Sequence, residues 1–103
     1  MTEEEKEEVK RDLEKSVKIS FRLAENVINQ IEKKLKKGDN VTRMTAMILQ
    51  YTTSMLLASS ISMHRNVAKL NEETIKNMLS KTIADALGMA NSGAIKAESV
   101  REH

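Results

Sequence analysis

The chain has 103 residues, which is the usual length of one domain. It contains no proline, no cysteine, three glycines and only two aromatic residues, Phe21 and Tyr51. This composition favours helices over a β-sandwich or barrel, and it excludes disulfides, zinc–thiolate sites and cysteine nucleophiles. The net charge of +2 gives no overall field that would select nucleic acid or an anionic membrane as the partner.

Charge is unevenly distributed along the chain. Residues 1–15 contain seven acids and four bases, a balance of −3, whereas residues 16–37 contain six bases and two acids, a balance of +4. The acidic first residues resemble neither a secretory signal nor a transit peptide. Because the sequence also lacks cysteine, we expect a cytoplasmic protein.

The first predicted helix spans about residues 3–37. Most of its apolar residues recur at steps of three and four, which is the spacing of one helix face and not of a strand. Two interleaved seven-residue repeats form a heptad-like seam: Val17, Ala24 and Ile31 with Phe21, Ile28 and Leu35. Early glutamates and late lysines suit the helix dipole, and Gly38 predicts the end of the helix.

The second predicted helix spans about residues 42–69, with several candidate N-caps before it. Residues 44–63 contain no charged side chain over 20 positions, which is long enough to cross a bilayer. Eight of these positions are polar, however, and aromatic anchors at the ends are missing. We therefore prefer a central helix covered by its neighbours to a membrane-spanning one, and we consider a membrane partner disfavoured.

A third, shorter helix is predicted over residues 72–87. Asn71 is its expected N-cap, and Gly88 is expected to end it. The remaining residues, 89–103, predict a flexible or partly helical tail. Residues 1–88 are accordingly expected to form a single helical domain.

The predicted fold is all-α: two long antiparallel helices and a shorter third form a bundle that oligomerisation completes. A first helix of about 35 residues would extend for roughly 50 Å, beyond the diameter of a compact chain of this length. We therefore expect a homo-oligomer, most simply a dimer; the alternative is a monomer with a bent or shorter first helix. The residues expected at the interface are Val17, Phe21, Ala24, Ile28, Ile31, Leu35, Met47, Tyr51, Met55 and Ala58.

The sequence does not contain the residue spacings that are typical of catalytic or metal sites. His64 has no second metal ligand three or four positions away, and we expect it to be a solvated residue near a helix end. His103 is expected in the tail. No glycine-rich phosphate loop or nucleophile motif is present. We therefore predict no enzyme, and no catalytic, metal or cofactor site.

The basic cluster is the strongest sequence feature that suggests a ligand. It consists of Lys33, Lys34, Lys36 and Lys37, with Arg43 nearby in the sequence. Lysines at a helix end can grip phosphates, but they also stabilise the helix dipole and keep a long helix in solution. The sequence therefore favours a non-enzymatic oligomerisation and interaction protein, an adaptor, assembly subunit or regulator, that binds another protein through helix faces. The alternative is a small helical nucleic-acid-binding protein that uses the basic cluster.

Overall fold

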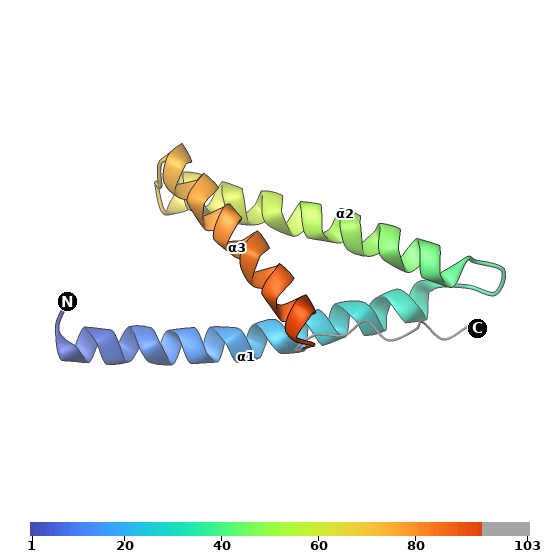
Figure 1. Cartoon of the computed structure of the whole chain (residues 1–103), viewed down its shortest axis with the longest axis horizontal. Helices are drawn as coiled ribbons and strands as arrows, with labels where there is room; N and C mark the ends of the chain where they lie inside the picture. Colours follow the sequence, from blue (N-terminus) through green and yellow to red (C-terminus); the bar gives the residue numbers. More distant parts are fainter. Residues whose placement is uncertain (94–103) are drawn as a thin grey trace. The chain divides into compact units, whose positions relative to one another are not determined.

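A computed structural model of the chain describes residues 1–93 (Figure 1). Three α-helices, α1 (Glu3–Lys34), α2 (Val41–Ser62) and α3 (Glu72–Ser92), and a π-helical turn, η1 (Met63–Val67), account for most of these residues. No strand occurs among them, so the predicted all-α class is confirmed. The chain divides into two compact units, the first being Met1–Asp39 with α1 and the second beginning at Asn40.

Helix α1 begins with a capped and acidic first turn. The hydroxyl of Thr2 accepts a hydrogen bond from the backbone N–H of Glu5 at 3.1 Å, and glutamates at residues 3–5 lie at the positive end of the dipole. The helix ends at Lys34, three residues before the predicted end at residue 37.

The early end of α1 has a local cause. The carboxylate of Asp39 accepts a hydrogen bond from the backbone N–H of Lys36 at 2.7 Å, while Leu35 is extended. Gly38 has a positive φ of 99°, so it serves the following turn and not the residue directly after the helix.

Helix α2 is capped by Asn40, whose side chain accepts a hydrogen bond from the N–H of Arg43 at 3.0 Å. The hydroxyls of Thr53, Ser54 and Ser59 each donate to the backbone carbonyl four residues earlier in the same helix. These polar side chains are thus satisfied by their own backbone, which explains how a charge-free helix can contain so many of them.

The prediction that α-helix continues to residue 69 is wrong, because α2 passes into the π-helical turn η1 after Ser62. The N–H of Ala68 donates to the carbonyl of Met63, and that of Leu70 donates to the carbonyl of His64. Between them Lys69 has a left-handed φ of 56°, which turns the chain toward α3. These wider backbone turns end the helix without a glycine or proline.

Helix α3 confirms one predicted boundary and corrects the other. The side chain of Asn71 caps it by accepting from the N–H of Thr74 at 2.8 Å. The helix does not end at residue 87; it continues through Gly88 to Ser92, and Gly93 adopts the left-handed conformation that closes it. The first residues of the predicted tail are therefore helical, and residues 94–103 lie outside the described part of the chain.

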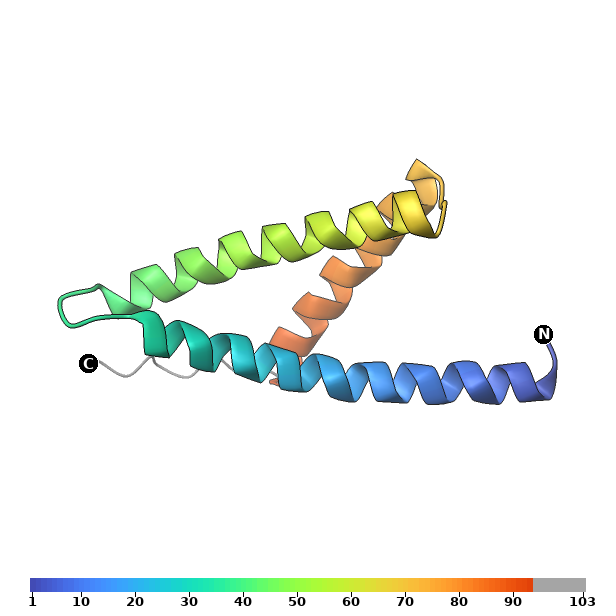
Figure 2. The ribbon, with the colours of Figure 1, turned by 180° about the vertical axis from the view of Figure 1, so that it is seen from behind.

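Within the second unit, α2 and α3 meet at η1 and diverge away from it, as Figure 1 and Figure 2 show. Ile75, in the first turn of α3, is 4% exposed and is the buried centre of this junction. Two hydrogen bonds also span the junction, because the guanidinium of Arg65 contacts the carboxylate of Glu72 at 2.6 and 3.0 Å. Most of α2 and α3 therefore extends beyond the region where they pack.

Candidate interaction surfaces

The first candidate surface is an apolar stripe along α1, formed by Val9, Leu13, Val17, Phe21, Ala24 and Ile28. All six side chains are exposed; Phe21, for example, retains 44% of its surface. Ile31 and Leu35, which continue the same spacing, are buried at 5% and 9%. Of the six interface residues predicted on the first helix, four thus lie on an open face and two do not.

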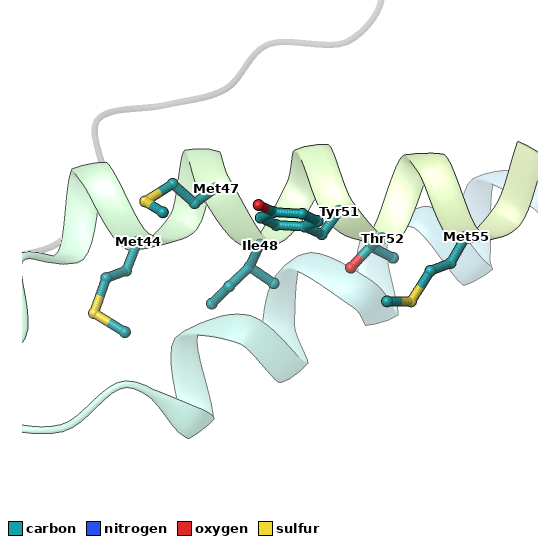
Figure 3. A pocket seen from close by; sticks show the side chains of 6 residues that line it. All are labelled: Met44, Met47, Ile48, Tyr51, Thr52 and Met55. Atoms are coloured by element: carbon teal, nitrogen blue, oxygen red, sulfur yellow. The ribbon is translucent and has the colours of Figure 1, made fainter.

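The second surface is a groove on α2 with a volume of about 310 Å³. Its walls come from residues spaced three and four apart on one helix face: Met44, Met47, Ile48, Tyr51, Thr52 and Met55 (Figure 3). Tyr51 and Met55 are 64% and 68% exposed. The predicted covering of this helix by neighbours is therefore not found for this face, and the α2 groove is an open apolar surface rich in adaptable methionines.

Half of the residues that form the α2 groove were predicted from the sequence. Met47, Tyr51 and Met55 were predicted interface residues, and the groove contains all three. Met44, Ile48 and Thr52 were missed, although they stand three or four positions from those residues, which is the signal that would have found them. Ala58, also predicted, is exposed and belongs to a neighbouring hollow that extends to η1 and includes Met63 and Val67.

The junction of α2, η1 and α3 encloses only a small hollow of about 40 Å³. His64 lines it beside Ile75 and is partly buried, so the prediction of a solvated histidine is wrong. Its Nδ1 lies 2.7 Å from the carbonyl oxygen of Ser60 and 3.3 Å from the hydroxyl of the same residue. Since a carbonyl oxygen only accepts, Nδ1 donates to it, and this bond fixes the ring against its own helix.

The basic cluster is divided by the end of α1. Lys33 and Lys34 lie in the last helical turn, whereas Lys36 and Lys37 follow it in the connecting segment. All four side chains are exposed. Arg43 belongs to the other compact unit. The lysines are thus accessible, but they do not form one helical face of the kind that fits a nucleic-acid groove.

Acidic and histidine side chains are dispersed over the described residues. Among residues 1–93, no three His, Asp or Glu side chains lie close enough together to hold a metal ion. The same part of the chain contains no helix with a stretch both long and apolar enough to span a membrane.

Comparison of the chain with protein-family models, with curated proteins and with solved structures finds no match.

Proposed function

We propose that this chain is a non-enzymatic, cytoplasmic interaction protein whose helices form a bundle with a second copy and bind another protein. It would act as an adaptor, assembly subunit or regulator. The function of such a protein lies in its helix faces, so the apolar surfaces described above are its working parts.

One observation carries the proposal: the described residues expose most of their large apolar side chains. Eighteen of these are exposed, whereas only Ile31, Leu35 and Ile75 are buried. Isolated apolar residues on a surface are common, but here eight of the eighteen belong to two continuous surfaces at helical spacing, the α1 stripe and the α2 groove. Burial of apolar surface provides about 25 cal/mol per Å², so these faces gain substantially from a covering partner.

Sedimentation equilibrium over a range of concentrations tests the proposal directly. The chain has a mass of 11.6 kDa, and we expect the dimer at micromolar concentration. A monomer mass throughout that range would contradict the self-association on which the proposal depends. In that case the α2 groove would remain as the surface that could bind another protein.

Nucleic-acid binding is the weaker alternative. Exposed lysines support it, but they are split between a helix and a connecting segment. The described surface offers Phe21 and Tyr51 as aromatic side chains on which a base could stack, and these belong to different compact units.

A further inference from the structure

The apolar stripe of α1 is long enough to form an interface by itself. The 32 residues of α1 rise roughly 48 Å in total. The stripe covers most of this length. Figure 1 shows α1 as one uninterrupted helix. Within residues 1–39, α1 is the one helix, so that unit provides no second helix to cover the stripe.

Charged residues follow one flank of the stripe at seven-residue spacing: Arg11, Lys18, Glu25 and Glu32. Seven residues complete nearly two helical turns, so all four lie on the same side of α1. Lys18 and Glu25 are each one turn from Phe21 and therefore border the stripe. The two toward the N-terminus are positive and the two toward the C-terminus are negative. None of the ion pairs found in residues 1–93 uses them.

We propose that two copies of the chain pair through α1 in antiparallel orientation, with a two-fold axis passing near Phe21. This inference rests on the proposed function, because it specifies the interface through which the chain associates with itself. In this register Val17 packs between Ala24 and Ile28 of the second copy. The apolar stripes then overlap from Val17 to Ile28, and each Phe21 lies beside its own copy.

Charge complementarity selects this orientation. In the antiparallel pair Lys18 lies level with Glu25 of the second copy, and Arg11 lies level with Glu32. Two-fold symmetry repeats both, so four opposite-charge pairs flank the interface. The same orientation places the acidic residues 1–15 of one copy beside the basic residues 16–37 of the other.

A parallel pair loses this match. The flank that carries Lys18 and Glu25 in one copy would then lie across from the opposite flank of the second copy, so these four charges would not meet one another. The acidic ends would also lie together, which is unfavourable. The α2 groove, a second open apolar surface, contains no charged residue and so does not select an orientation.

Spin-label distances in the full chain test the inference, because the absence of cysteine allows one label per copy. Glu8 and Lys33 face away from the stripe, so Glu8→Cys and Lys33→Cys leave the proposed interface intact. In the antiparallel dimer two labels at residue 8 are separated by more than roughly 40 Å. Mixing the two labelled variants should add a short distance of roughly 25 Å, the width of two packed helices.

Other results of the spin-label and mass measurements would contradict different parts of the proposal. Short distances from Glu8→Cys alone would indicate a parallel pair and would overturn the inference while leaving the proposed function in place. A dimer mass without the short distance in the mixed sample would place the interface on α2 or α3, with the same consequence. A monomer mass would contradict the proposed function itself. As a matched control, a label at Arg22→Cys, near the two-fold axis, should give a short distance in either orientation.

Discussion

Among single residues, Gly38 and Gly88 occupy backbone conformations with opposite requirements. Gly88 lies in the helical interior of α3, and a methyl group there would contact nothing within 4 Å. Gly38 also has open space around it, but its φ of 99° is one that residues with a side chain rarely adopt. The space around the two glycines is therefore the same, and the backbone conformation decides which of them tolerates a side chain.

We expect Gly88→Ala to raise the free energy of unfolding by roughly 0.5–1 kcal/mol, because alanine restricts the unfolded chain and favours the helix. The matched control Gly38→Ala should lower it by about 1 kcal/mol, since the same methyl group is strained at a positive φ. Thermal and urea unfolding followed by far-UV circular dichroism measure both values. Equal effects of the two substitutions would contradict the helical assignment at Gly88.

The ion pair of Arg65 and Glu72 gives the junction a defined pH dependence. Hydrogen bonds from Arg65 lower the pKa of the Glu72 carboxyl from its ordinary value, and attraction to the guanidinium acts in the same direction. A lowered pKa means that the folded chain holds the carboxylate more strongly than the unfolded chain does. This stabilisation is present above the ordinary glutamate pKa of about 4.3 and is lost as the pH falls through the lowered value.

We therefore expect the Glu72→Gln variant to lose less of its melting temperature than the unmutated chain on acidification from neutral pH to about pH 3. The difference should be small, because both groups are more than half exposed to solvent. Glu73→Gln is the matched control, since Glu73 has no ion pair among residues 1–93. Melting curves at a series of pH values measure it; parallel curves for Glu72→Gln and the unmutated chain would show that the pair does not stabilise the junction.

At the scale of elements, the three helices and the N-cap of α3 were predictable, whereas the C-terminal ends of the helices were not. Apolar spacing predicted α1 and α3, candidate caps and a long uncharged stretch predicted α2, and Asn71 was recognised as a cap from its residue type. Glycine was a poor end signal because a helix interior tolerates it at a cost of about 1 kcal/mol, as Gly88 illustrates. At the end of α1 the Asp39 carboxylate accepts a hydrogen bond from the backbone N–H of Lys36, and η1 contains no glycine or proline that would have predicted the end of α2.

The candidate surfaces were likewise predictable only in part. Spacing along the chain identifies which residues share a face, so the α1 stripe and half of the α2 groove were predictable. Spacing does not show what covers a face, because that depends on how distant segments pack. Ile31 and Phe21 belong to the same seam, yet one is buried and the other exposed.

A charge exchange on α1 tests the antiparallel pairing at this scale. Lys18→Glu should raise the dimer dissociation constant about tenfold, because it turns two attractive pairs with Glu25 into repulsive ones of about 0.5–1 kcal/mol each. Adding Glu25→Lys should restore the unmutated value, since the double variant has opposite charges level with each other again. Sedimentation at low and high salt measures both constants, and the difference should shrink at high salt. A double variant no tighter than Lys18→Glu alone would contradict the pairing.

For the whole molecule, Ile31 is the residue on which folding and assembly are expected to depend together. It is 5% exposed and continues the apolar stripe, so Ile31→Asp places a carboxylate where water is excluded. We expect a loss of roughly 3 kcal/mol or more, seen as dissociation or unfolding. Ile19→Asp, on the opposite side of α1 and 47% exposed, is the matched control. That residues 1–88 form one domain stays a prediction; a single unfolding transition of the unmutated chain would support it.

Replacing Lys33, Lys34, Lys36 and Lys37 by glutamine separates the proposed function from nucleic-acid binding. If the cluster holds phosphates, the unmutated chain should bind duplex or single strands with a steep salt dependence. The variant should then bind more weakly, with a slope of log affinity against log salt shallower by nearly one per lost contact.

We expect instead that the lysine cluster does not bind nucleic acid. The net charge is only +2, and the four lysines are exposed charges near the end of α1, each worth about 0.3–1 kcal/mol through the helix dipole. The glutamine variant should therefore stay folded and keep the dimer mass at physiological salt, because the proposed pairs use Lys18 and Arg11 instead. Nucleic-acid binding, measured by fluorescence anisotropy, should be negligible for both proteins. Tight, salt-sensitive binding by the unmutated chain that the variant loses would reverse the order of the two functions.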